Sequence, residues 1–167
     1  MSARRLRPQR ILALMHEALV PPDSIEGLSE EQIHPWKMEY DVKTTLEQMG
    51  HEVHPVGIYG DLSVLREALD RVQPDIVFNM MEEFDGQPLF DQHLVSYLEL
   101  QKVPYTGCNP RGLTLAHDKA LSKQILAHHR IPVPQFGVFR IGRKIRRLAS
   151  LKFPLLVKSL VDEGSVG

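Results

Sequence analysis

Short apolar runs alternate with segments of helical period along the first part of the chain. Four runs have the length and composition of strands: 11–15, 52–56, 76–80 and 103–106. Strands that alternate with helices build βαβ units, in which right-handed crossovers join parallel strands of an open sheet. The alternation therefore predicts a small Rossmann-like α/β domain that extends to about Gly107.

Three segments between these runs repeat apolar residues three or four positions apart, as one face of a helix requires. They are Met38, Val42, Leu46 and Met49; Leu65, Ala68, Leu69 and Val72; and Phe90, Leu94, Tyr97 and Leu98. Gly50 is a stop for the first helix, Asp61 or Ser63 is available to cap the second, and Pro74 closes the second.

Beyond Gly107 the pattern changes. A turn leads into a helix predicted to run through Asp118 toward His129, followed by an extended stretch at 135–139 and a strand at 155–158. We interpret this region as an α+β unit whose sheet is incomplete, and we expect the chain to be truncated. An unfinished sheet would expose an unpaired strand edge, which favours self-association. A homodimer is therefore one option for this chain.

Composition excludes several classes of partner. The chain has 167 residues, with 20 basic and 21 acidic side chains and a net charge of -1, so no overall field favours nucleic acid or a membrane surface. The basic cluster at 140–152 lacks interleaved aromatic residues, and no apolar run is long enough to span a bilayer. The single cysteine, Cys108, suits a reducing compartment, so we expect a cytoplasmic protein. The scattered histidines predict no metal site.

Two lysines are candidates for contact with phosphate. Lys119 lies one helical turn from Lys123, a pair that in many proteins is only a solvated helix face. Lys158 ends an apolar run and precedes the segment 164–167, Gly-Ser-Val-Gly. A fixed cation near backbone amides of such a loop can bind phosphate oxygens.

Acidic residues follow the first and third predicted strands. Open parallel sheets bind ligands beyond the carboxyl ends of their strands, where Glu17, Glu82, Glu83 and Asp85 are expected. Carboxylates facing that crevice could recognise an amine. The alternative is that they are ordinary solvated loop residues.

Four blocks of sequence occur together in a recognisable order: 103–107 (Val-Pro-Tyr-Thr-Gly), 118–123 (Asp-Lys-Ala-Leu-Ser-Lys), 131–134 (Ile-Pro-Val-Pro) and 153–158 (Phe-Pro-Leu-Leu-Val-Lys). In this combination the chain resembles the D-alanine:D-alanine ligase branch of the ATP-grasp superfamily.

The resemblance implies a division of the chain into three parts. Residues 1–107 would form a Rossmann-like pre-ATP-grasp domain with a parallel sheet, 108–131 a connecting helical segment, and 132–167 the incomplete α+β start of the ATP-grasp nucleotide-binding domain.

The resemblance also implies an activity. The parent protein would be an ATP-dependent carboxylate–amine ligase that forms an acyl phosphate, uses ATP and Mg²⁺, and acts on a small amino acid or peptide. Lys119, Lys158 and Ser165 would contact ATP phosphates, and Glu17 would meet the substrate amine. Metal ligands are expected beyond Gly167, no catalytic residue is assigned within the chain, and the chain alone is expected to be inactive.

Two alternatives remain open. The first is an ATP-grasp ligase for a different amino acid or peptide, because the first strand lacks a glycine-rich turn and Glu82 and Glu83 stand where relatives have a His-Gly pair. The second is a Rossmann-like binding or regulatory module without chemistry. The sequence offers this module neither the acidic pair of a receiver domain nor a Gly-x-Gly-x-x-Gly turn after the first strand.

Overall fold

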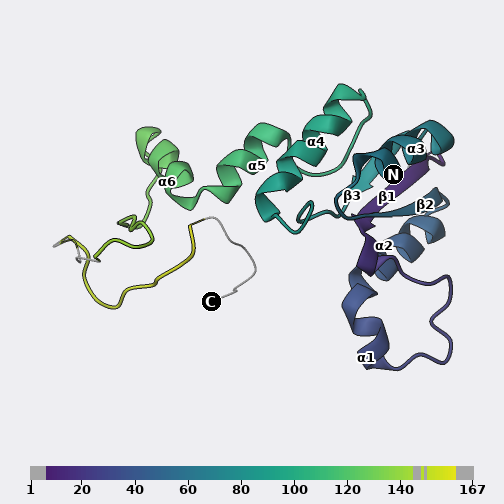
Figure 1. Ribbon diagram of the computed structural model, residues 1–167, viewed down its shortest axis with the longest axis horizontal. Coiled ribbons are helices and arrows are strands. Elements are labelled where there is room, and N and C mark those ends of the chain that lie inside the picture. The colour runs from purple at the N-terminus through teal and green to yellow at the C-terminus, as the bar shows by residue number, and fades with distance from the viewer. Residues whose placement is uncertain (1–6, 145–147, 149, 161–167) are drawn as a thin grey trace, which may run out of the picture. The chain divides into compact units, whose positions relative to one another are not determined.

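The structure is a computed structural model that describes residues 7–144, 148 and 150–160. The chain divides into two compact units, Met1–Asn109 and Pro110–Gly167 (Figure 1). The predicted α/β class with a parallel sheet is confirmed, and all three strands of the sheet lie in the first unit.

The sheet has its first strand in the middle. Its strands are β1 (Arg10–His16), β2 (Glu52–Ile58) and β3 (Ile76–Asn79). Their order is β2-β1-β3, and both pairings are parallel, with Ile11 opposite Val53 on one side and Ile76 on the other. Three of the four predicted strands are therefore confirmed. The carboxyl ends of all three lie at one edge of the sheet.

The described residues of the first unit also form four α-helices. They are α1 (Glu30–Ile33), α2 (Lys37–Gln48), α3 (Leu62–Val72) and α4 (Asp91–Leu100), joined by 3-10 turns η1 (Glu17–Leu19), η2 (His34–Trp36) and η3 (Pro88–Phe90). Leu65 of α3 and Leu94 of α4 pack in one core with Leu12 and Leu14 of β1. The second and third predicted helices are thus confirmed, although Phe90 belongs to η3 and is exposed.

Asp61 is the residue that caps α3. Its carboxylate accepts a hydrogen bond from the backbone N–H of Ser63 at 2.7 Å. Hydrogen bonds from the side chain and the backbone of Ser63 hold the pKa of Asp61 below its usual range. The structure therefore selects Asp61 from the two candidate caps.

The first predicted helix is confirmed as α2, but its most buried residues are charged. Met38 and Met49 of the apolar stripe are 54% and 55% exposed, whereas Glu39 and Lys43 are 2% and 7% exposed. The Nζ atom of Lys43 lies 3.1 Å from Asp23, which holds the segment after η1 against the helix. The face of α2 with the lowest exposure is therefore not the one that the spacing of its apolar residues indicates.

The fourth predicted strand, 103–106, is wrong, because only one parallel bridge forms, between Val77 and Tyr105. Val77 donates to the carbonyl of Pro104 at 2.8 Å, and Thr106 donates to the carbonyl of Val77 at 2.9 Å. The next donor, Asn79 N–H, bonds the Thr106 hydroxyl at 3.0 Å instead of a main-chain carbonyl. The ladder therefore stops after one bridge.

The second unit contains α5 (Pro110–His117) and α6 (Lys119–His128). The prediction of one helix through Asp118 is wrong, since Asp118 has extended dihedrals and its carboxylate accepts from the N–H groups of Ala120 and Leu121 at 3.0 and 2.8 Å. Aspartate satisfies the orphan donors of a helix start better than it propagates a helix.

The predicted strand at 155–158 is also wrong. Leu156 and Val157 are 80% and 93% exposed, and no described residue of 110–160 belongs to a strand. The extended stretch 135–139 likewise has no ladder partner among these residues. A strand is stabilised by its neighbours, so an apolar run alone does not form one.

The phenol of Tyr105 predicts a pH effect. Its hydroxyl donates to Glu99 at 2.8 Å, and burial together with this bond raises its pKa to about 12, from a usual value of 10.0. The folded state then keeps a proton that the unfolded chain releases, so the free energy of unfolding should fall as pH rises from about 10 to about 12. Urea unfolding of the Tyr105→Phe variant should show a shallower fall over this window. Equal slopes for both proteins would contradict the assignment.

Candidate functional site

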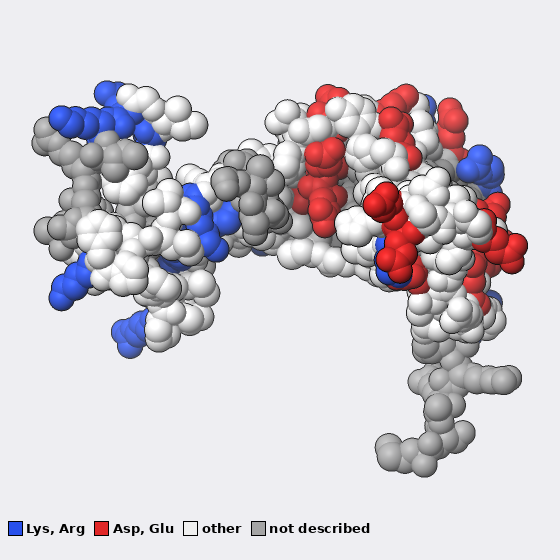
Figure 2. Space-filling view, turned by 90° about the horizontal axis from the view of Figure 1, so that it is seen from below, with Lys and Arg blue, Asp and Glu red and all other residues white. Residues whose placement is uncertain are grey.

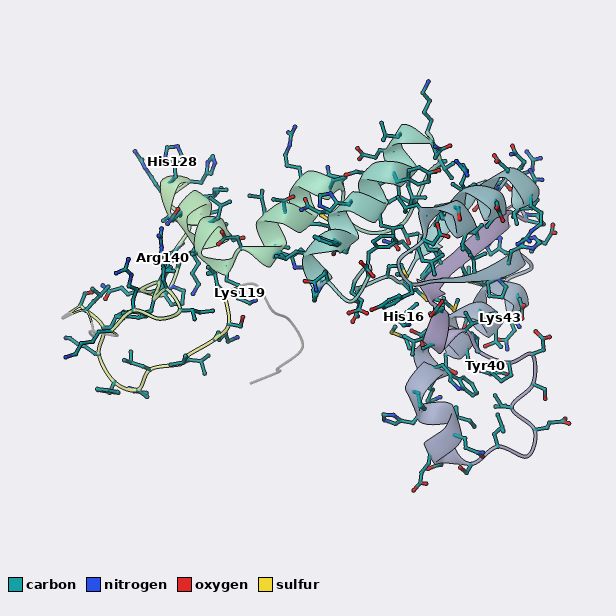
Figure 3. The ribbon with its side chains drawn as sticks, in the orientation of Figure 1. His16, Tyr40, Lys43, Lys119, His128 and Arg140 are labelled. Atoms are coloured by element: carbon teal, nitrogen blue, oxygen red, sulfur yellow. The ribbon has the colours of Figure 1, made fainter. Side chains whose placement is uncertain are left out.

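His16 connects two strand-end segments. Its Nδ1 atom accepts a hydrogen bond from the backbone N–H of Ala18 at 3.1 Å, which leaves the proton of the neutral ring on Nε2. Nε2 lies 3.5 Å from a carboxylate oxygen of Glu83. Figure 3 labels His16. One imidazole thus joins the turn after β1 to the loop after β3.

Tyr59, which follows β2, completes the contact between the three strand ends. Its ring meets that of His16 edge-on, with centroids 5.4 Å apart. Its carbonyl accepts from the backbone N–H of Asp85 at 2.9 Å. Gly86 has a φ of 68°, and a Cβ there would lie 2.9 Å from the Tyr59 hydroxyl, so a larger residue would disturb this contact.

The three acidic candidates lie at the same edge of the sheet but differ in environment. Glu17 is exposed in η1, and a Cβ on Gly57 of β2 would come within 2.8 Å of its Cα, so the turn packs closely on β2. Glu82 is exposed. Glu83 is half-buried against His16. The structure therefore brings Glu83 into a defined contact.

Sequence reasoning did not assign His16 or Glu39. The signal for His16 was available, because it is the last residue of β1 and precedes Glu17 directly. Glu39 gave no such signal, since its 2% exposure results from the fold of α2.

The phosphate candidates lie in the second unit. Lys119 begins α6, and its backbone N–H donates to the carbonyl of Leu160 at 3.3 Å, two residues beyond Lys158. Lys158 is exposed, and Ser165 lies outside the described residues. Lys123, one turn after Lys119, instead has its Nζ 5.1 Å from the centroid of the Phe136 ring. The start of α6 is therefore hydrogen-bonded to the segment that contains Lys158.

The second unit is strongly basic. Asp118 is the only Asp or Glu in the sequence from 110 to 160, and its carboxylate is used in the cap of α6. Figure 2 shows Lys and Arg side chains on this unit, whereas mostly Asp and Glu are seen on the first. A field of this sign attracts anions such as phosphate.

Within the part of the chain that the structure describes, no three His, Cys, Asp or Glu side chains gather as a metal site. Among the same residues, no helix has the length and apolar character needed to cross a membrane.

No family model matches the chain. It is 32% identical over 143 residues to the uncharacterized protein y4sG of Sinorhizobium fredii, covering 80% of this chain and 41% of that protein. It is 29% identical over 141 residues to the D-alanine–D-alanine ligase of Syntrophotalea carbinolica, covering 84% and 44%. The chain thus spans less than half the length of these curated relatives.

Solved structures show the same fold. The D-alanine–D-alanine ligase from Bacillus anthracis complexed with ATP superposes with a TM-score of 0.59 at 20% identity, over 83% of this chain and 42% of the ligase. Another structure of the ligase from that organism gives a TM-score of 0.54 at 22% identity, over 75% and 36%.

The two nitrogens of His16 can be tested separately. In His16→Asn the amide oxygen stands near the position of Nδ1, whereas in His16→Gln the amide nitrogen stands near the position of Nε2. We expect His16→Asn to keep the hydrogen bond from Ala18. His16→Gln should lose this bond, and its free energy of unfolding should therefore be lower by about 1 kcal/mol. Urea unfolding with the amide resonance of Ala18 as probe measures both. Equal stability of the two variants with an unmoved Ala18 resonance would refute the assigned tautomer.

Proposed function

We propose that this chain is part of an ATP-dependent carboxylate–amine ligase. It is D-alanine–D-alanine ligase-like in sequence and in fold, and it corresponds to the amino-terminal part of such ligases. The observation that carries the proposal is the backbone bond from Lys119 to Leu160, which joins the segments of both candidate lysines in a basic unit. The proposed parts are the pre-ATP-grasp domain at 1–107, a connector at 108–131, and the start of the nucleotide-binding domain at 132–167.

The proposed reaction has two steps. ATP supplies a phosphoryl group to a substrate carboxylate, which gives an acyl phosphate and ADP. The amine of the second substrate then attacks the acyl carbon, the C–N bond forms, and phosphate leaves while the amine loses a proton. Phosphoryl transfer of this kind relies on positioned positive charge.

In this scheme Lys119, Lys158 and Ser165 bind the ATP phosphates. A lysine ammonium acts as a point charge and needs no fixed planar geometry, which suits the exposed Lys158. Mg²⁺ accompanies ATP, and we place its ligands beyond Gly167.

Glu17, Glu82 and Glu83 bind the amino group of a small amino acid or peptide. They follow β1 and β3 at the edge where parallel sheets bind ligands. The identity of the amino acid is decided by these segments.

ATP binding by the chain tests the phosphate site. We expect millimolar ATP to shift the amide resonances of 118–120 and 158–160, and the Lys119→Gln variant to weaken binding by about tenfold, since one charge-assisted contact is lost. Lys123→Gln is the matched control, because it removes the same charge one turn further along α6. Equal weakening by both variants, or no shift at either segment, would refute the assignment.

The same samples test the activity of the isolated chain. With Mg²⁺, ATP and an amino acid we expect no ADP above the background of a protein-free sample. Steady ADP formation that depends on the amino acid would overturn the expectation that the chain is inactive alone.

The proposal includes a homodimer. The apolar stripe of α2 borders an open groove of about 680 Å³, which is lined by His34, Lys37, Met38, Asp41, Val42, Thr45, Leu46 and Phe78. Lys37 and Asp41 of this groove pair with each other at 2.9 Å, so the groove offers an apolar surface without net charge to a second copy related by a two-fold axis.

We expect the Met38→Glu variant, which places a charge in this groove, to be a monomer at concentrations where the parent chain dimerises. Analytical ultracentrifugation measures the change. Leu100→Glu, at a position that is 77% exposed and outside the groove, is the control. A parent chain that is monomeric throughout, or a dimer unaffected by Met38→Glu, would refute this interface.

A further inference from the structure

His16 contacts both segments that carry candidate carboxylates. It is the last residue of β1, and its two ring nitrogens face different partners. Nδ1 accepts from the backbone N–H of Ala18 at 3.1 Å, and Nε2 lies 3.5 Å from a carboxylate oxygen of Glu83. The side chains of His16 and Glu83 are 24% and 35% exposed, so a small ligand can reach both.

The Nδ1 contact stabilises the turn that contains Glu17. His16 is the N-cap of η1, and the N–H of Ala18 is one of the donors that a helical turn leaves without a main-chain acceptor. The turn packs closely on β2, since a Cβ on Gly57 would lie 2.8 Å from the Cα of Glu17. Loss of the cap would therefore loosen the turn and change the position of Glu17.

The Nε2 contact orients Glu83. Because Nδ1 serves as an acceptor, the proton of the neutral ring is on Nε2, the nitrogen that faces the carboxylate. A neutral donor orients a carboxylate without cancelling its charge, so Glu83 can still attract a cation. Neutral His16 thus supports both candidate carboxylates at once.

Tyr59 contacts the imidazole from the end of β2. The two rings meet at 77° with centroids 5.4 Å apart, and the Tyr59 carbonyl accepts from the N–H of Asp85 in the loop that carries Glu83. In the part of the chain that the structure describes, Glu83 and Tyr59 are the titratable side chains placed against this ring from other elements. A phenol carries no charge in mildly acid solution, so a charge on His16 acts mainly on Glu83.

We propose that His16 is a positioning residue of the amine site, which supports amine binding by Glu17 and Glu83 only while its ring is neutral. The inference rests on the proposed function and adds control by pH to the same site. A proton on Nδ1 removes the acceptor for Ala18 and leaves a positive charge beside Glu83, which repels a substrate ammonium. Histidine side chains change charge between about pH 5 and about pH 8. Protonation of His16 and amine binding therefore oppose each other.

The coupling is measured first on the free chain. Between about pH 8 and about pH 5, the ring resonances of His16, the amide resonance of Ala18 and the carboxyl resonance of Glu83 should shift together. His54→Asn is the matched control, because Nε2 of His54 lies 2.9 Å from Glu52 within β2, and it should leave these shifts unchanged. Resonances of Ala18 and Glu83 that do not follow the His16 ring would contradict the proposal.

The affinity for alanine is measured next, because the ammonium and carboxylate groups of alanine keep their charges over this range. We expect the parent chain to bind alanine about fivefold or more weakly at the acid end than at the alkaline end. His16→Asn and His16→Gln cannot take up the proton, so their affinities should not change with pH, whereas His54→Asn should behave like the parent. A parent affinity that is independent of pH, or variants as sensitive to pH as the parent, would overturn the proposal.

A double-mutant cycle tests whether His16 acts through Glu83. At the alkaline end, His16→Asn keeps the acceptor for Ala18 and loses the donor toward Glu83, so it should weaken alanine binding about fivefold. Glu83→Gln should weaken binding as well, and the double variant should bind little more weakly than Glu83→Gln alone. Losses that add in full would show that His16 does not act through Glu83.

Failure of this inference is distinguishable from failure of the proposed function. Alanine binding that is absent, or that Glu83→Gln leaves unchanged, defeats the proposed amine site together with the inference that rests on it. Alanine binding that depends on Glu83 but has the same pH dependence in the parent chain and the His16 variants defeats the inference alone. ATP binding by Lys119 is measured separately and tests the phosphate site.

Discussion

The burial of β1 on both sides and both faces is the constraint on which the first unit depends. Residues Ile11–Met15 are at most 3% exposed, and the two neighbouring strands both pair with β1. Because both pairings are parallel, three segments distant in sequence leave the sheet at one edge. A shift of β1 by one residue would exchange the faces of its side chains and also separate His16 from Glu83.

The spacing of apolar residues and the amino-acid composition were sufficient to predict the elements whose stability comes from one continuous apolar face. They located β1, β2, β3 and the buried stripes of α3 and α4. They failed where a single polar contact decides the structure. Asp118 ends one helix and begins another through two hydrogen bonds, and the run 155–158 has no strand beside it to satisfy its main chain.

The candidate site was likewise predictable only in part. The rule that ligands bind at strand carboxyl ends indicated the segments of Glu17 and Glu83, because it depends only on strand order and direction. The tautomer of His16 depends on a backbone donor two residues away, and Lys43 of α2 pairs with Asp23, twenty positions earlier in the chain. Neither leaves a periodic signal. Apolar spacing on α2 in fact indicated a different face.

The charges of the two units suit two different ligands of the proposed reaction. A ligase must bind an anionic phosphate and a cationic amine, and here the basic surface belongs to the second unit while the candidate carboxylates Glu17, Glu82 and Glu83 belong to the first. Glu17 follows β1 directly, and Glu82 and Glu83 lie in the loop after β3. Substrate choice can therefore change in these segments while the sheet that positions them stays the same.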